Sequence, residues 1–196
     1  MIPERYFIVY KPFRMVSQFV SPYEQRKLDA LDFVFPEGTN AVGRLDDESE
    51  GLLILTTDKT LTHRLLHPDK QHVRSYIVQV EKVVSEETLE KLRSGMEILV
   101  KGRGKYMTRP CKVEIIKKPE NLPQRDESLT ERVPCSWLKF VLMEGKNRQI
   151  RKMCKGVRHK CRRLIRTQIE DLELGNMQPG EVKEIPRTEL FRLLKI

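Results

Sequence analysis

The feature that most constrains the fold is the segment Gly43–Gly51, because it leads without a break into the apolar run Leu52–Leu55. The segment reads GRLDDESEG, so four carboxylates lie between its two glycines. A short apolar run bounded by turn residues is typical of a buried strand. We therefore expect a loop anchored by a core strand, and such a loop can hold one carboxylate in a fixed position for chemistry.

The acidic segment contrasts with the charge of the whole chain. The 196 residues carry a net charge of +9, and the pI is about 9.4. Such an excess of positive charge indicates a polyanionic partner. The chain contains no apolar stretch of the ~20 residues that a membrane span needs, and its first residues show no signal-peptide pattern. We expect a cytoplasmic protein without a membrane partner.

The cysteines offer little sign of a metal site. Cys111, Cys135, Cys154 and Cys161 lack CxxC spacing, which favours reduced and mostly buried thiols. Cys154, His159 and Cys161 could supply three zinc ligands, but the sequence offers no fourth ligand nearby and the spacing fits no common zinc signature. We expect core and surface residues here, and no bound metal.

The rest of the chain alternates short strands with short helices. This pattern predicts an α+β fold with a mixed, largely antiparallel central sheet and flanking helices. We expect residues 1–196 to form a single domain, either undivided or built from two subdomains that share one sheet. A basic turn is predicted at 101–105 and a surface loop at 119–134. The predicted strands are Arg5–Tyr10, Leu52–Leu55, Arg74–Val83, Met96–Val100, Arg109–Lys117, Cys135–Met143 and Arg163–Leu174. The predicted helices are Gln25–Phe33, Lys59–Leu66 behind Asp58, a helix between Ser85 and Gly95, Asn147–Arg158 and Arg187–Leu194.

A second motif, Glu144–Lys152, opens one of these helices. Ile150, Met153, Cys154 and Val157 are spaced to form one apolar helical face for the core. The opposite positions are basic, and few acids compensate them as far as Arg166. Phosphate binding therefore explains the surface better than a merely solvated face does. The basic residues are Lys146, Arg148, Arg151, Lys152, Lys155, Arg158, Lys160, Arg162, Arg163 and Arg166.

Together these motifs resemble a known family. GRLDDESEGLLILTTD and EGKNRQIRKMC resemble the two hallmark segments of the RsuA/RluB/E/F class of pseudouridine synthases, and Arg74–Val80 resembles the strand between them. The segments occur in the family's order, Lys11-Pro12 also matches, and the resemblance spans nearly the whole chain. It implies the pseudouridine synthase catalytic fold.

The chain departs from this class in two places. Most members carry a small S4-type RNA-binding domain before the catalytic domain, whereas Arg5–Tyr10 already matches the first catalytic strand here. We expect no S4 domain, and the E branch of the class, which the chain resembles most, also lacks one. Arg74 and Ser75 stand where the family usually has lysine and threonine, which keeps the charge and the hydroxyl group.

The resemblance assigns Asp46 as the catalytic residue. The reaction breaks a glycosidic bond to uracil and rejoins the same base through carbon, without redox change, so we expect no cofactor. An unperturbed aspartate has a pKa of about 3.9 and is ionised at neutral pH, ready for nucleophilic or electrostatic work. Whether Asp46 attacks the ribose or the base stays open at this stage.

The resemblance also implies roles around Asp46. Arg151 would pair with Asp46, although a phosphate contact is the alternative. Tyr76 would lie against a uracil flipped out of the RNA, although core packing in a strand is the alternative. Arg44 would fill the space that the flipped base leaves. Further RNA contacts are expected from Lys146, Gln149 and Lys152.

Several functions stay open from sequence alone. We expect a monomer. By resemblance to the E branch, we expect it to modify one uridine in 23S large-subunit ribosomal RNA, with small-subunit ribosomal RNA or tRNA as alternatives. A two-carboxylate hydrolase or magnesium nuclease would instead use Asp46 and Glu48 together. A non-catalytic RNA-binding protein of ribosome assembly would not need Asp46. We assign no chemistry to Asp47, Glu48 or Glu50.

Overall fold

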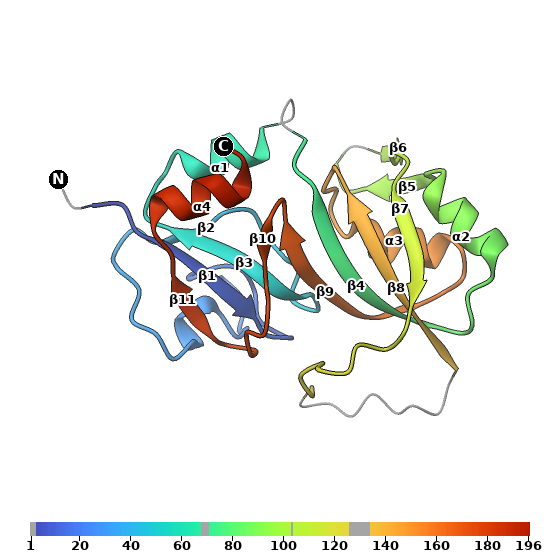
Figure 1. The fold of residues 1–196 in the computed structure, drawn as a ribbon, viewed down its shortest axis with the longest axis horizontal. Helices are drawn as coiled ribbons and strands as arrows, with labels where there is room; N and C mark the ends of the chain where they lie inside the picture. The colour runs from blue at the N-terminus through green and yellow to red at the C-terminus, as the bar shows by residue number, and fades with distance from the viewer. Residues whose placement is uncertain (1–2, 68–70, 103, 126–133) are drawn as a thin grey trace. The chain divides into compact units, whose positions relative to one another are not determined.

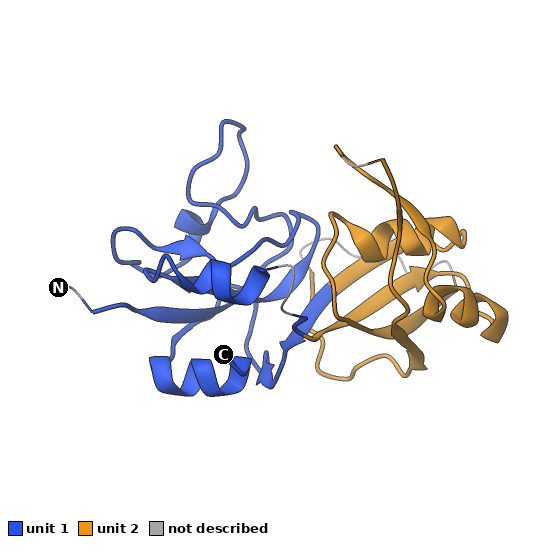
Figure 2. Ribbon diagram, turned by 90° about the horizontal axis from the view of Figure 1, so that it is seen from above, with its two compact units in different colours: residues 1–72, 165–196 blue, residues 73–164 orange. Residues whose placement is uncertain are grey.

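The computed structural model describes residues 3–67, 71–102, 104–125 and 134–196 (Figure 1). The chain forms two compact units, residues 1–72 with 165–196 and residues 73–164 (Figure 2). Each unit contains its own strands and helices, so each is described separately. The prediction of a single domain with a shared sheet stays a prediction.

The first unit is built on a sheet with one parallel pairing. In chain order its strands are β1 (Tyr6–Lys11), β2 (Asn40–Ala41), β3 (Glu50–Thr56), β9 (Cys161–Ile169), β10 (Leu172–Glu173) and β11 (Val182–Glu184). The chain enters this unit within β9. The order across the sheet is β11-β1-β3-β9, with β2 beside β3 and β10 beside β9. Among these pairings only β3 with β9 is parallel, so the predicted, largely antiparallel sheet is confirmed.

Two helices lie together beside these strands (Figure 1). They are α1 (Leu61–Leu66) and α4 (Arg187–Leu194), and α4 has the predicted bounds. The ring of Phe191 in α4 meets the ring of Tyr6 in β1 edge-on, with 5.7 Å between centroids. The guanidinium of Arg64 in α1 lies 5.7 Å from the centroid of the same Phe191 ring. The Phe191 ring therefore joins α4 to β1 and α1 to α4.

The prediction that Asp58 caps α1 is wrong, because the helix begins at Leu61, two residues later than expected, and Thr60 occupies the N-cap position. Asp58 instead holds the turn before the helix. Its Oδ1 accepts hydrogen bonds from the Thr60 amide and hydroxyl, both at 2.7 Å, and its Oδ2 accepts one from the Tyr6 hydroxyl at 3.0 Å. Burial alone would raise the pKa of the Asp58 carboxyl, but the bonds from Thr60 and Tyr6 outweigh it and lower the pKa.

The second unit pairs its strands antiparallel throughout its described residues. In chain order its elements are β4 (Arg74–Glu81), α2 (Glu86–Arg93), β5 (Glu97–Val100), β6 (Gly104–Met107), β7 (Lys112–Ile116), β8 (Cys135–Leu142) and α3 (Gln149–Gly156). The strand order is β4-β8-β7, and β5 pairs with β6 in a separate hairpin. Ser85 caps α2 as predicted, since its side chain accepts from the Thr88 amide.

The core of the second unit lies between the strands and both helices. Leu89 and Leu92 of α2 join the apolar face of α3 against the buried side chains of β4 and β8. The predicted apolar stripe of α3 is thereby confirmed, with Met153 and Cys154 fully buried and Val157 packed at the edge of the cluster. The helix is shorter than predicted, because Arg148 and Arg158 at its two ends have positive φ.

The predicted helix Gln25–Phe33 is wrong. Only one 3₁₀ turn, η1 (Leu28–Ala30), forms there. The backbone of Arg26 and Leu28 pairs with residues 16 and 18, and the Phe33 and Phe35 rings lie 5.4 and 5.6 Å from the ring of Phe7. Burial of these rings against β1 overrides the helical spacing.

The predicted strands Met96–Val100 and Arg109–Lys117 are confirmed as β5 and β7, but the strand between them, β6, was not predicted. Two glycines with positive φ, Gly102 and Gly104, shorten the turn, and β6 pairs with β5. Arg103 of the predicted basic turn lies outside the described residues, as do residues 126–133 of the predicted surface loop. The predicted strand 163–174 is a hairpin of β9 and β10, with the buried Glu170 in a left-handed conformation at the turn.

Two predictions from composition can be compared with the structure. The helices in the described part of the chain all fall short of the length and apolarity that a membrane span requires. The four cysteines are free, but only Cys154 is buried and Cys135 is exposed, so the prediction of mostly buried thiols is wrong. Burial raises the pKa of the Cys111 thiol to about 11, and the nearby Glu144 adds to the shift.

We predict that Gly51→Ala destabilises the protein far more than Gly38→Ala. Both glycines have positive φ, but a Cβ at Gly51 would lie 2.3 Å from the carbonyl oxygen of Arg166, whereas nothing lies within 4 Å of a Cβ at Gly38. The expected loss of unfolding free energy is about 3–5 kcal/mol for Gly51→Ala and about 1–2 kcal/mol for Gly38→Ala. Urea denaturation measures both, and equal losses would contradict the steric argument.

Candidate active site

Two serines hold the acidic loop that leads into β3. The Ser17 hydroxyl donates to the carbonyl of Leu45 at 2.9 Å and lies 3.1 Å from the Leu45 amide, which donates to it. On the other side, the Ser49 amide donates to the Asp46 carbonyl at 3.0 Å, and the Ser49 hydroxyl donates to Asp46 Oδ2 at 2.8 Å. Asp46 is half-buried between the buried Leu45 and Ser49. The loop therefore fixes the direction of this carboxylate.

A buried lysine supports the same loop from β1. Lys11 is fully buried, and its Nζ donates to the carbonyls of Met15 at 2.5 Å, Pro12 at 2.8 Å and Asp47 at 3.4 Å. A buried ammonium group is tolerated only when its donors are satisfied, and these carbonyls accept from it. Lys11 thus ties the end of β1 to the acidic loop. Sequence reasoning noted Lys11 only as a family match and missed this role.

The acids of the loop lie close together. One carboxylate oxygen from each of Asp46, Asp47 and Glu48 lies within 4.8 Å of the others, and all three residues are half-buried. Within the described ranges, this is the only trio of possible metal ligands so arranged. Acid clusters of this kind are common without a metal, so the expected absence of one stays a prediction. Glu50 differs, because it is buried at the start of β3, while Arg44 is exposed.

The zinc hypothesis for Cys154, His159 and Cys161 finds no support among the described residues. His159 Nδ1 lies 2.8 Å from the carbonyl oxygen of Glu81, and that contact orients its ring. Burial raises the pKa of the Cys154 thiol well above its usual range, which disfavours the thiolate that zinc requires. These residues fit the core and surface roles expected for them.

In the second unit, the motif Glu144–Lys152 is organised around one buried carboxylate. Glu144 Oε2 accepts from the Tyr106 hydroxyl at 2.6 Å, and Oε1 accepts from the Arg109 amide at 2.9 Å and from Gln149 Nε2 at 2.7 Å. The Gln149 Oε1 in turn accepts from the Lys146 amide at 3.0 Å. This network holds the loop before α3. Sequence reasoning assigned no role to Glu144, the residue at the centre of the network.

The basic side chains of this motif differ in exposure. Arg148 and Lys155 are exposed, while Lys146 and Lys152 are half-buried. The Lys146 ammonium lies 4.6 Å from the centroid of the Tyr106 ring, and Lys152 Nζ donates to the Asn147 carbonyl at 2.6 Å. The predicted RNA contacts Lys146 and Lys152 are therefore held by this loop.

Gln149, also predicted to bind substrate, has a different position. Its side chain is buried, with 4% of its surface exposed. Within the loop, the side-chain amide donates to Glu144 and accepts from the Lys146 backbone N–H. These contacts describe a residue that positions the loop. Its RNA contact stays a prediction.

The other predicted residues lie in the two units as follows. Asp46 and Arg44 belong to the loop of the first unit. Tyr76 lies in β4 of the second unit, 8% exposed within the core cluster, so core packing accounts for most of its surface. Arg151 is half-buried in α3, with Nη1 3.7 Å from Cys161 Sγ. The pairing of Arg151 with Asp46 stays a prediction.

Comparison with known proteins identifies the family. The sequence pattern of the family described as RNA pseudouridylate synthase matches residues 5–156. The chain belongs to this family. It is therefore an RNA pseudouridine synthase, an isomerase, and the resemblance drawn from the two motifs is confirmed.

Relatives and a solved structure agree with this assignment. The synthase is 38% identical to ribosomal large subunit pseudouridine synthase E of Vibrio parahaemolyticus, over 89% of this chain and 71% of the relative. It is 37% identical to the protein of the same name from Xanthomonas axonopodis pv. citri, over 86% of this chain and 87% of the relative. A crystal structure of a pseudouridylate synthase, 23% identical, superposes with a TM-score of 0.78 over 98% of this chain and 75% of its own. The predicted fold class is thereby confirmed.

We predict that Glu144→Ala destabilises the synthase by about 2–4 kcal/mol, because it leaves the buried Gln149 amide and the Arg109 N–H without their acceptor. Tyr106→Phe is the matched control, since it removes only one of the three hydrogen bonds to Glu144, and about 1 kcal/mol is expected. Urea denaturation of both variants measures the difference. Losses of equal size would show that Glu144 does not organise the loop.

Proposed function

We propose that the synthase converts one uridine of large-subunit ribosomal RNA to pseudouridine, with Asp46 as the catalytic residue and with the uridine flipped out of its stack. The proposal for the RNA rests on the relatives of the E type at 37–40% identity. Small-subunit ribosomal RNA and tRNA are the alternative substrates. A non-catalytic role in ribosome assembly is the alternative outside enzymology.

The isomerisation of uridine to pseudouridine requires one ionised group and a closed pocket from the protein. The bond from C1′ to N1 of uracil breaks, a bond from C1′ to C5 forms, C5 loses a proton, and N1 gains one. Atoms and electrons balance without a cofactor. A fixed carboxylate can act on the sugar or on the base in this sequence, and Asp46 has that role in our proposal.

The observation that carries the assignment of Asp46 is the way its loop is held. Ser49 binds both its backbone carbonyl and its Oδ2, and Ser17 binds the preceding Leu45 through both backbone groups. A catalytic group acts efficiently when neighbouring hydrogen bonds fix its position before substrate arrives. Of the clustered acids, Asp46 is the one placed at the centre of these contacts.

The basic residues of the Glu144–Lys152 motif supply the RNA contacts in this proposal. Lys146, Arg148 and Lys152 lie in one loop and the first turns of α3, in a protein with net charge +9. Such a surface binds phosphates without reading sequence. Arg44, exposed beside Asp46, is proposed to replace the flipped uridine, and Tyr76 to contact the uracil ring.

We predict that Asp46→Asn lowers turnover more than about 1000-fold while RNA affinity stays within about twofold, because the change removes the charge and keeps the shape. Unmodified large-subunit ribosomal RNA is incubated with each protein, and pseudouridines are mapped by carbodiimide modification and primer extension. Asp47→Asn is the matched control, since Asp47 lies in the same acid cluster, and near wild-type activity is expected.

The outcomes separate the alternatives. An unmarked large-subunit RNA with wild-type protein would reject this RNA as the substrate, and an active Asp46→Asn variant would reject the role of Asp46. Shortened RNA, or loss of activity in excess chelator, would instead favour a metal nuclease that uses the acid cluster.

We predict that Lys152→Ala and Lys155→Ala each weaken RNA binding about equally for all sequences and reduce the slope of log affinity against log salt by ~1. Lys91→Ala on α2 is the control, because this exposed lysine is already paired with Glu87 at 2.6 Å. Filter binding across a range of salt concentrations measures the slopes. An unchanged slope would show that neither lysine contacts a phosphate and that both belong to an ordinary solvated face.

A further inference from the structure

The first unit carries a projecting loop, residues 18–27, that the proposed mechanism does not use. Its two ends are joined by backbone hydrogen bonds, from the Val16 amide to the Arg26 carbonyl at 2.9 Å and from the Leu28 amide to the Gln18 carbonyl at 3.0 Å. The Phe19 ring anchors it in the core, 5.4 Å from the ring of Phe35. The 18–27 loop is therefore a closed and anchored structure.

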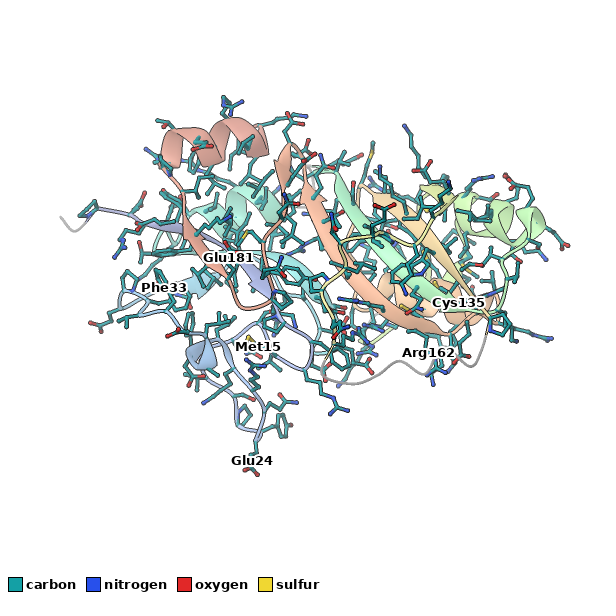
Figure 3. The ribbon with its side chains drawn as sticks, turned by 60° about the horizontal axis from the view of Figure 1, so that its bottom comes forward. Met15, Glu24, Phe33, Cys135, Arg162 and Glu181 are labelled. Atoms are coloured by element: carbon teal, nitrogen blue, oxygen red, sulfur yellow. The ribbon has the colours of Figure 1, made fainter. Side chains whose placement is uncertain are left out.

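The tip of the 18–27 loop exposes apolar surface. Tyr23 is 72% exposed and Val20 is 81% exposed. A hydrogen bond from the Tyr23 amide to the Ser21 hydroxyl at 3.2 Å shapes the turn. Figure 3 shows Glu24 at the outer end of the loop, away from Met15 at its base. An exposed tyrosine and an exposed valine on the same anchored loop indicate a binding role, because neither is buried in the core.

The base of the 18–27 loop is joined directly to the loop of Asp46. Ser17, one residue before it, holds Leu45 through both backbone groups, and Lys11 donates to the carbonyls of both Met15 and Asp47. From Ser17 to Tyr23 the chain can reach at most ~20 Å. This reach equals the length of about six stacked nucleotides at ~3.4 Å each. The tip of the 18–27 loop therefore lies no farther from Ser17, which holds the loop of Asp46, than about six stacked nucleotides extend.

We propose that Tyr23 stacks on an unpaired base of the RNA within about six nucleotides of the target uridine, with Val20 beside it as an apolar edge. The inference rests on the proposed function. Glu24 adjoins Tyr23 and repels phosphate, so the ligand of the tip is a base face, while Arg26 and the lysines of α3 serve the backbone. Every base has a π-face, so the contact adds affinity for the RNA whichever base stands at that position.

The test compares Tyr23→Ala with Tyr23→Trp on unmodified large-subunit ribosomal RNA. Tyr23→Ala is expected to lower kcat/KM about tenfold while the single-turnover rate at saturating RNA is unchanged, and Tyr23→Trp is expected to retain wild-type values. Val34→Ala, at a residue that is 93% exposed outside the 18–27 loop, is the control and leaves activity unchanged. The tenfold loss should not vary with salt, unlike that of Lys152→Ala.

A second measurement identifies the base. Abasic nucleotides are placed singly within six positions of the mapped uridine in a synthetic RNA fragment. One of them is expected to lower kcat/KM of the wild-type protein about tenfold and to cause no further loss in Tyr23→Ala. The proposal would be overturned if, at every abasic position, the loss of kcat/KM caused by the abasic nucleotide multiplied with the loss caused by Tyr23→Ala.

The outcomes also distinguish this inference from the function it rests on. Wild-type protein that makes no pseudouridine in this RNA would reject the proposed substrate. Active wild-type protein with an equally active Tyr23→Ala variant would reject the stacking role alone. A defect of Tyr23→Ala seen only on ribosomal particles, and not on bare RNA, would show that the tip binds a protein and would overturn the proposal.

Discussion

The first unit depends on the close approach of β3 and β9 at Gly51. The backbone of Arg166 lies where any side chain at position 51 would have to be, and the Arg166 guanidinium donates from Nε to the carbonyl of Leu52 at 2.8 Å. This parallel contact fixes the start of β3, and the loop of Asp46 ends there. The direction of the proposed catalytic carboxylate is therefore set by strand packing as well as by Ser49.

Each of the two motifs is organised by a buried charged group. Lys11 holds the acidic loop through backbone carbonyls, and Glu144 holds the basic loop through donors from Tyr106, Arg109 and Gln149. In both cases the sign of the buried group is opposite to that of most charged side chains in the loop. Such an arrangement lets like charges gather at the surface, because the opposite charge beneath them reduces their repulsion.

Local pattern predicted much of the fold, and the failures have a common cause. The apolar run Leu52–Leu55, the capped helix after Ser85 and the helix Arg187–Leu194 were all found, since each carries its own spacing or capping signal. The segment 25–33 was assigned wrongly because Phe33 and Phe35 pack against β1, which no local signal shows. The break at Glu170 was missed for the same reason, since His72 and Lys195 pair with it from distant parts of the chain.

The sequence by itself determined the family, because the two motifs and the strand between them occur in the family's order, and the family comparison bears this out. It also indicated Asp46 and the basic face of α3 as the residues to consider. Only the tertiary structure decided which residues hold them. Ser17, Lys11 and Glu144 act through hydrogen bonds to groups 28 to 38 residues away, and pairing at such separations follows from packing and leaves no periodic trace in the chain.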